Sequence, residues 1–294
     1  MQLIHKAKVV TFKGYGPDAY AGDGITGPDD PAFSRRILCE GDSWFSLGAI
    51  PSSNLLFPLR FSQSTLLINL ARPGDTIVRM SSMAKNPDLH QLIVNPNFST
   101  RWDALFLSGG GNDLIDMADQ IICSPSPGAG QHMFDYIDTI ELERLKLSIQ
   151  QGYRAIDKLR QGSDKNRDMP IVAHLYDYPT PRNAKAQFLG VPFMGPWLYA
   201  AFKTNDVPQE FWISITDYLF EAMANAIMAL SGQIENFHVI SATKGVLTRA
   251  LLGTTGVDGD WLNEIHLTAT GYEKVAAVVS PYLDSILNPS MREG

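Results

Sequence analysis

The sequence has few cysteines, no long apolar run and no excess of basic charge. Its 294 residues include only two cysteines, Cys39 and Cys123. This number allows neither a disulfide framework nor a set of zinc-binding thiolates. Both cysteines are expected to be free thiols, and a single bridge between them stays open. No apolar stretch reaches the roughly 18 residues of a membrane-spanning helix, so no transmembrane segment is expected.

Basic residues are also scarce. Lys and Arg number 24 against 31 Asp and Glu, which gives a net charge of −7, and no basic cluster is denser than Arg35–Arg36. A nucleic-acid partner is therefore not expected, since such proteins carry dense basic patches. The apolar run between Met1 and Lys13 is too short for a secretory leader, which favours a cytoplasmic protein. A hydrophobic content of 45% instead favours a folded chain with a large core.

Five short runs rich in β-branched and aliphatic residues predict buried strands. They are residues 37–40, 65–70, 104–107, 170–175 and 237–240. Apolar residues three or four apart predict helices over 140–159, 209–230 and 270–287. Strands that alternate with helices indicate an α/β fold whose parallel sheet is covered on both faces. The residues that bind or react with a ligand then lie in loops at the carboxyl ends of the strands.

Residues 1–34 are predicted to form an irregular N-terminal arm, because Gly, Pro and Asp crowd residues 14–34. Nothing divides the rest into two complete sets of elements, so 35–290 are expected to form one domain. An aromatic stretch at about 183–207 is interrupted by Gly and Pro, which predicts an insertion rather than one regular element. Such an insertion suits a lid, an apolar pocket, a part packed on the main domain, or a contact in a homo-oligomer.

A Gly-Asp-Ser-Trp segment, residues 41–44, directly follows the first predicted strand. It places Ser43 in a tight turn at the carboxyl edge of the sheet, where a nucleophile is useful. A serine hydroxyl reacts as a nucleophile only with a base within hydrogen-bond reach. On its own, a Gly-Asp-Ser tripeptide is more often an ordinary turn. His266, after the fifth strand and before the last helix, is the base that the pattern favours.

Two further strand ends carry hydrogen-bond donors. Residues 108–113, with three consecutive glycines before Asn112, follow the third strand, and residues 71–75 follow the second. The side-chain amide of Asn112 can converge with the backbone N–H groups of Ser43 and Gly74 at the same edge. Three donors around one point would stabilise an oxyanion.

These four segments, in this order, resemble the four blocks of the SGNH (GDSL-type) hydrolase superfamily. The matching residues are Ser43, Gly74, Asn112 and His266, and the blocks span residue 37 to about residue 275. The resemblance implies a flavodoxin-like, three-layer α/β/α fold whose five-stranded parallel sheet has the order 2-1-3-4-5. It also implies an esterase that hydrolyses carboxylic esters of small or medium acyl chains through an acyl-serine intermediate, with no metal or organic cofactor.

The sequence departs from that superfamily in the last block. The usual aspartate, three residues before the histidine, is Asn263 here. An amide oxygen can hold the tautomer of His266 but brings no negative charge. Asn263 or a backbone carbonyl is preferred by position as the group that orients His266, followed by Asp260 and then by Glu264.

Several functional alternatives stay open at this point. Asn263 leaves room for a noncatalytic module that keeps the fold to bind a ligand or a partner. Among enzymes, a carbohydrate O-acetylesterase, a thioesterase or a lysophospholipase would differ only in the shape of the pocket. The Gly-x-Ser-x-Gly elbow of the α/β-hydrolases is absent, which argues against that class.

The candidates for the walls of a substrate pocket are Trp44, next to Ser43, and Tyr176 and Tyr178, just past the fourth strand. Asp177 between the two tyrosines shares this position. His174, in or at the end of the same strand, is interpreted as a structural histidine of the core. Structural or exposed positions are also expected for the remaining histidines, His5, His90, His132 and His238. The expected partner is a small-molecule ester, and the oligomeric state stays open.

Overall fold

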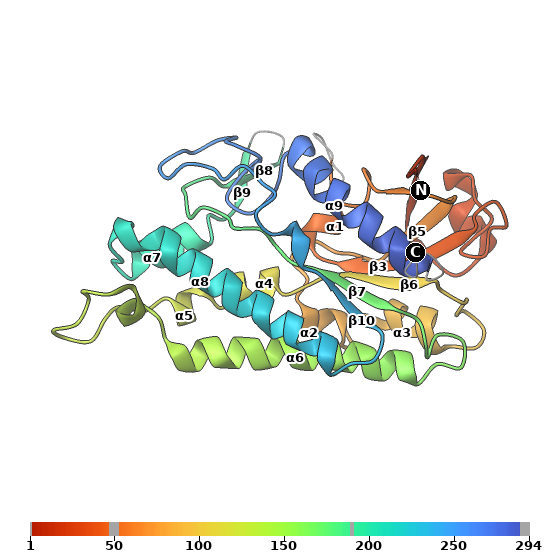
Figure 1. Cartoon of the computed structure of the whole chain (residues 1–294), viewed down its shortest axis with the longest axis horizontal. Helices are drawn as coiled ribbons and strands as arrows, with labels where there is room; N and C mark the ends of the chain where they lie inside the picture. Colours follow the sequence, from red (N-terminus) through yellow and green to blue (C-terminus); the bar gives the residue numbers. More distant parts are fainter. Residues whose placement is uncertain (1, 47–52, 189–190, 289–294) are drawn as a thin grey trace.

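The structure, a computed structural model, describes residues 2–46, 53–188 and 191–288. Its main sheet has six parallel strands in the order β10-β7-β6-β3-β5-β2 (Figure 1). Their bounds are β2 (Lys8–Thr11), β3 (Arg35–Gly41), β5 (Thr65–Asn69), β6 (Ala104–Ser108), β7 (Ile171–His174) and β10 (Phe237–Ile240). Without β2, this order is the predicted 2-1-3-4-5 of a flavodoxin-like sheet.

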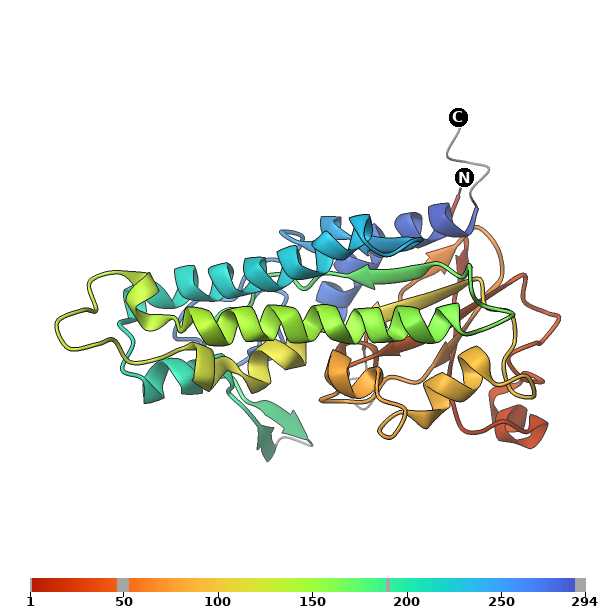
Figure 2. The same ribbon diagram turned by 90° about the horizontal axis from the view of Figure 1, so that it is seen from below.

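Helices cover both faces of the sheet and complete three layers (Figure 1). On one face runs α6 (Thr139–Gln161), and against it pack α2 (Ile77–Met80), α3 (Pro87–Val94) and α8 (Gln209–Met228) (Figure 2). On the other face lies α9 (Ala269–Leu287), with the short α1 (Ser43–Ser46) near it. The further helices are α4 (Gly111–Asp116), α5 (Ala118–Ile121), η2 (Met133–Tyr136), and η4 (Ser241–Thr243). The predicted helices therefore all form, with slightly different ends.

Helix α8, continued by η3 (Ala229–Gly232), is long and apolar enough to cross a membrane by length and composition alone. Half of its most apolar window is buried inside the protein, where it packs on α6. Core helices of soluble proteins meet the same criterion, so this segment is weak evidence for a membrane span.

The N-terminal arm is not irregular throughout, which corrects the prediction for residues 1–34. Residues 8–11 form β2, which pairs in parallel with β5 and gives the sheet six strands instead of five. Val10 is buried in this pairing. The rest of the arm contains β1 (His5–Lys6), which pairs with β4 (Arg60–Phe61), and η1 (Pro17–Asp23). Pairing with a strand far along the chain creates β2, and the local sequence does not show that partner.

The aromatic insertion at 183–207 contains a hairpin and a helix. These are β8 (Ala186–Phe188), β9 (Val191–Met194) and α7 (Leu198–Thr204), so no single element crosses it, as predicted. The ring of Phe202 stacks on that of Trp212 in α8, with the centroids 5.5 Å apart. Phe202 and Leu198 are buried, so α7 packs into the core. The side chains of residues 187–193, which include Phe188 and Phe193, lie outside the described part of the chain.

Strands β3 and β6 approach each other closely at their carboxyl ends, where Gly41 pairs with Ser108. A Cβ atom on Gly41 would lie 2.7 Å from the Cβ of Ser108 and 3.0 Å from its carbonyl oxygen. Only glycine fits this approach without moving the strands. Gly41 therefore fixes where the chain leaves the sheet toward Ser43.

We expect Gly41→Ala to lower the free energy of unfolding by about 1–3 kcal/mol, because the added methyl group pushes two paired strands apart. Chemical denaturation followed by circular dichroism measures this change. Gly232→Ala is the matched control, since a Cβ atom there meets nothing within 4 Å. Equal stability of the two variants would show that the strands do not approach this closely.

Candidate active site

Ser43 lies at the carboxyl end of β3, where the chain turns from the sheet into α1. Asp42 Oδ1 stabilises this turn by accepting a hydrogen bond from the Trp44 N–H group at 2.9 Å. The Asp42 carbonyl oxygen accepts another from the Phe45 N–H group at 3.1 Å. Ser43 itself is buried, yet it lines a cavity at this edge of the sheet.

His266 reaches Ser43 from the other end of the chain. Its Nε2 atom lies 2.9 Å from Ser43 Oγ, which is hydrogen-bond distance. His266 lies in residues 258–268, which precede α9 and are called the histidine loop here. The buried guanidinium of Arg182 holds this loop by donating to the carbonyl oxygens of Trp261, at 3.3 Å, and Asn263, at 2.8 Å. The nucleophile and the base that the sequence predicts are thus brought together.

The Asn263 side chain orients the ring of His266. Its Oδ1 atom accepts hydrogen bonds from the backbone N–H groups of Ile265 at 3.0 Å and His266 at 2.9 Å, which identifies this atom as the oxygen. His266 Nδ1 lies 3.1 Å from Oδ1 and 3.0 Å from Nδ2. A proton on Nδ1 donates to Oδ1 and leaves Nε2 ready to accept the proton of Ser43. Donation from Nδ2 to Nδ1 would select the opposite tautomer, which an aspartate could not do.

Asp260 does not contact His266, which corrects the hypothesis that it supplies the acid. Its carboxylate accepts a hydrogen bond from Lys274 Nζ and another from the backbone N–H group of Thr248, each at 2.6 Å. The Lys274 ammonium and these bonds hold the pKa of Asp260 below its usual value although burial opposes them. Asp260 therefore stabilises the start of the histidine loop and does not contact the ring.

Glu264, the third-ranked alternative, is also engaged elsewhere. Its carboxylate is fully buried and accepts hydrogen bonds from backbone N–H groups at the start of α7, those of Trp197, Leu198 and Tyr199. The helix dipole favours an anion at this end of α7. Burial nevertheless raises the pKa of Glu264 to about 7. Glu264 thus joins the histidine loop to the aromatic insertion.

Asn112 and Gly74 follow β6 and β5, the two strands that flank β3. The Asn112 side chain, in α4 after β6, donates from Nδ2 to the carbonyl oxygen of Asp75 at 3.0 Å. This bond ties it to the turn after β5 and uses one of the two hydrogens of the amide. Gly74 has a φ of +77°, in the left-handed region that favours glycine. Asn112 lines the same cavity as Ser43.

Burial decides the charge of His266. The ring is enclosed next to Ser43, and this desolvation lowers the pKa of His266 from 6.5 to about 4. Asn263 is neutral and does not counteract it. At neutral pH, His266 is therefore uncharged and able to accept a proton.

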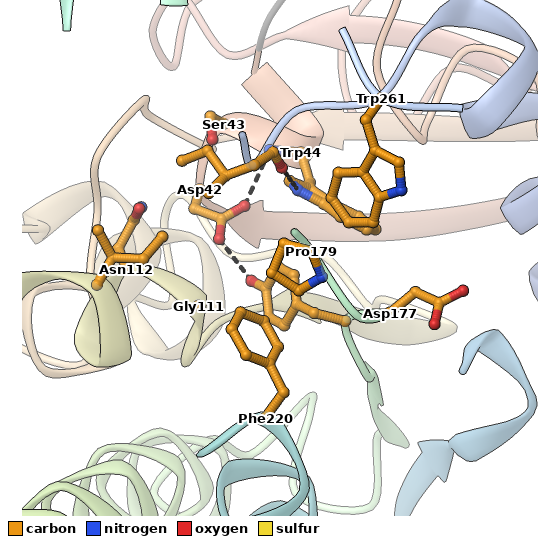
Figure 3. Close-up of a pocket in the computed structure, with 12 residues that line it drawn as sticks. Asp42, Ser43, Trp44, Gly111, Asn112, Asp177, Pro179, Phe220 and Trp261 are labelled. Atoms are coloured by element: carbon orange, nitrogen blue, oxygen red, sulfur yellow. Dashed lines mark hydrogen bonds between the residues drawn. The ribbon is translucent and has the colours of Figure 1, made fainter. Parts of the chain in front are cut away.

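A cavity opens beside Ser43 (Figure 3). Together with the open solvent at its mouth, its space amounts to about 320 Å³. Of the predicted wall residues, Trp44 and Tyr176 line it. The lining also includes residues that the sequence analysis did not single out, namely Gly111, Ile115, Pro179, Phe220, Trp261 and Ile265. Phe220 belongs to the apolar stripe of α8, and such a stripe has no local feature that distinguishes a pocket wall from the core.

Tyr178 does not line this cavity, which corrects the prediction. Its hydroxyl group donates to the Glu221 carboxylate, and its ring lies under Lys244 Nζ, 4.2 Å from the ring centroid. This charged cluster holds the side chain away from Ser43. Asp177, next to Tyr178, does line the cavity.

The ends of β3, β5 and β6 and the loop after β10 thus carry Ser43, Gly74, Asn112 and His266, in the predicted order.

The strand order and the order of these segments are those that the resemblance to the SGNH hydrolases implies.

Several solved structures are similar to it. An extracellular lipase from Streptomyces rimosus matches 85% of this chain and 98% of its own, at 14% sequence identity and a TM-score of 0.49. An acetylxylan esterase from Geobacillus stearothermophilus matches 87% of this chain and 94% of its own, at 11% identity and a TM-score of 0.42. A family 3 carbohydrate esterase from Clostridium thermocellum matches 86% and 96%, at 13% identity and a TM-score of 0.44. No family model and no curated protein matches the sequence.

We expect Asn263→Asp to raise the pKa of His266 by about 1–3 units, because a carboxylate beside Nδ1 stabilises the imidazolium. The two backbone N–H groups that now donate to Asn263 Oδ1 can donate equally well to a carboxylate oxygen, so the loop should keep its shape. NMR titration of the ring measures the pKa. Asp260→Asn is the control and should leave the pKa of His266 unchanged. An unchanged pKa in Asn263→Asp would mean that this side chain does not contact the ring.

Proposed function

We propose that the chain is a serine hydrolase that cleaves carboxylic esters with short acyl groups. The observation that carries this proposal is the 2.9 Å contact between Ser43 Oγ and His266 Nε2, with the ring held by Asn263 at Nδ1. A neutral imidazole at hydrogen-bond distance is the partner that a serine hydroxyl needs in order to attack a carbonyl carbon.

The proposed reaction begins when Ser43 Oγ attacks the carbonyl carbon of the ester and His266 Nε2 takes the hydroxyl proton. The electron pair of the carbonyl moves onto its oxygen, which the Asn112 amide and the backbone N–H groups of Ser43 and Gly74 stabilise. Collapse of this intermediate expels the alcohol, which takes the proton from His266 and leaves an acylated Ser43. Water, activated by His266, then attacks the acyl group and releases the acid.

Asn263 stabilises the imidazolium of His266 less than an aspartate would. An imidazolium forms in both half-reactions, and an amide oxygen stabilises it through a dipole rather than a full charge. The neutral side chain also permits the tautomer of His266 that carries its proton on Nε2 and is unable to act as a base. Turnover should therefore be slower than with a carboxylate at this position.

The cavity favours short acyl groups. Its volume of about 320 Å³ includes open solvent at the mouth, so the space that the side chains themselves enclose is small. In Figure 3, Asn112 and Trp261 lie on opposite sides of the cavity, and Phe220 closes the side formed by α8. Apolar walls suit an acyl chain, and the bulky Phe220 and Ile115 limit its length.

The alternative is a noncatalytic module with the same fold, which Asn263 in place of an aspartate favours. It requires no activated serine. Reaction of Ser43 with a serine-directed organophosphonate therefore separates the two proposals, because that reagent demands an activated hydroxyl.

We expect Ser43→Ala and His266→Ala each to lower kcat/KM for p-nitrophenyl acetate by about 10³-fold or more and to abolish phosphonate labelling. Ser285→Ala, which changes a half-buried serine on α9, is the matched control and should keep full activity. Circular dichroism checks that each variant is folded. Neither turnover nor labelling in the wild type would favour the noncatalytic module.

The acyl-length profile tests the pocket. The wild type should hydrolyse p-nitrophenyl acetate and butyrate at least about tenfold better than the octanoate, since a longer chain meets Phe220. Phe220→Ala should remove most of this preference by opening the end of the cavity. Phe211→Ala is the control, because Phe211 lies on the same helix but does not line the cavity. An octanoate rate equal to the acetate rate in the wild type would contradict the short acyl site.

A further inference from the structure

Next to Ser43, three side chains form a buried polar chain that the proposed reaction does not use: Asp42, Ser108 and His174. His174 Nε2 lies 2.9 Å from Ser108 Oγ, and Ser108 Oγ lies 2.9 Å from Asp42 Oδ1. The Tyr176 hydroxyl contacts the other carboxyl oxygen, Oδ2, and lies 3.1 Å from Ser108 Oγ. The Trp44 N–H group donates to Oδ1 and brings its own proton. Asp42 is 2% exposed, and Ser108 and His174 are fully buried. The contacts of Ser108 and His174 are therefore made to protein groups and not to outside solvent, whereas Asp42 and Tyr176 also line the cavity beside Ser43.

The outer end of the polar chain has a fixed direction. His174 Nδ1 lies 3.1 Å from the carbonyl oxygen of Leu175, and a carbonyl oxygen only accepts hydrogen bonds. The ring proton of a neutral His174 is therefore on Nδ1. Nε2 then carries a lone pair and requires a proton from Ser108.

The usual protonation states supply too few protons for this arrangement. Three close contacts, Nε2 to Oγ, Oγ to Oδ1, and the Tyr176 hydroxyl to Oδ2, each need one proton between their atoms. The hydroxyl groups of Ser108 and Tyr176 supply two, and an ionised Asp42 supplies none. One contact would then set two lone pairs against each other in a buried site, which is costly. The other tautomer of His174 only moves the conflict to the Leu175 carbonyl.

We propose that the buried polar chain holds one additional proton at neutral pH, so that Asp42 and His174 together carry no net charge. With the proton on Asp42, the carboxylic acid donates to Ser108, and Ser108 donates to His174. With the proton on His174, the imidazolium donates to Ser108, and Ser108 donates to an ionised Asp42. In either form each of these three contacts contains one proton. Only the longer contact between Ser108 Oγ and the Tyr176 hydroxyl, at 3.1 Å, contains none, because the Tyr176 proton lies toward Asp42 Oδ2.

The surroundings favour the form with the proton on Asp42. The ionisable groups that bear on Asp42 are Tyr176, Asp113 of α4, Tyr153 of α6 and Tyr272 of α9. Burial, together with the negative charge of Asp113, raises the pKa of Asp42 to about 6, although its hydrogen bonds oppose this. That pKa alone would leave Asp42 mostly ionised at pH 7. Because Ser108 donates to His174 in the proposed form, Asp42 loses one of the bonds that lower its pKa, and the pKa rises further. Burial lowers the pKa of His174 to about 4, so the imidazole is the weaker base.

The catalytic meaning of this proton rests on the proposed function. Asp42 directly precedes Ser43, whose N–H group belongs to the donors around the oxyanion. A carboxylate beside that site would oppose the negative charge that develops there, whereas a neutral acid would not. Loss of the additional proton at alkaline pH should therefore lower kcat.

NMR of the intact protein without ligand tests the proposal, with carboxyl-labelled aspartate and ring-labelled histidine. Asp42→Asn and His174→Gln assign the two signals. We expect at pH 7 a carboxylic-acid signal for Asp42 beside a neutral His174, or a carboxylate beside an imidazolium; both keep the proton. A carboxylate at Asp42 beside a neutral His174 at this pH would overturn the proposal.

Asp113 is the internal control. Burial raises its pKa to about 6 as well, but it accepts hydrogen bonds from backbone N–H groups, among them that of Ile77 at 2.9 Å. Each of those bonds brings its own proton, so Asp113 should give a carboxylate signal at pH 7. Carboxylate signals from both Asp42 and Asp113, with His174 neutral, would show that burial alone governs the two groups.

The same titration separates this proposal from the proposed function. If no ester is turned over at any pH, the proposed function fails while the NMR result still decides the proton count. If esters are turned over, kcat should fall about tenfold or more at alkaline pH. The midpoint of this fall should coincide with the pH at which NMR shows Asp42 and His174 losing the proton. An active enzyme without that loss would overturn the catalytic role of the proton.

Discussion

The parallel pairing of β3 with β5 and β6 is the constraint on which the site depends. Parallel strands end at the same edge of a sheet, so the residues that follow them meet there although they are far apart in sequence. Gly41 makes the pairing close enough that the chain leaves β3 directly beside Ser108. Ser43, the Gly74 turn and Asn112 inherit their positions from this edge.

The histidine depends on a different set of interactions. Its loop follows β10 but belongs to no sheet, so its shape comes from buried charged groups. Arg182 donates to the carbonyl oxygens of the loop, while the carboxylates of Asp260 and Glu264 accept from Lys274 and from backbone N–H groups. Two acidic side chains close to His266 in sequence thus serve the loop rather than the ring, which leaves Asn263 to orient it.

Two carboxyl groups that are buried to a similar degree differ in the protons that their hydrogen-bond partners supply. Asp42 and Asp113 are both buried near the same edge, and burial raises both pKa values to about 6. Asp113 accepts bonds from N–H groups that always carry a proton. Asp42 accepts one such bond, from Trp44, but otherwise faces hydroxyl groups and, through Ser108, an imidazole that itself needs a donor. The number of protons available, and not only the depth of burial, then decides which group is charged at neutral pH.

The sequence by itself determined the layers of the fold and the four strand-end residues, because apolar periodicity and glycine-rich turns are local features. The tertiary structure decided what depends on distant partners: β2 joins the sheet only through β5, and Phe220 becomes a pocket wall only because α8 lies beside Ser43. It also decided the partners of Asp260, Glu264 and Tyr178. A charged or aromatic side chain contacts whatever the fold places within reach, and spacing along the chain does not encode that neighbour.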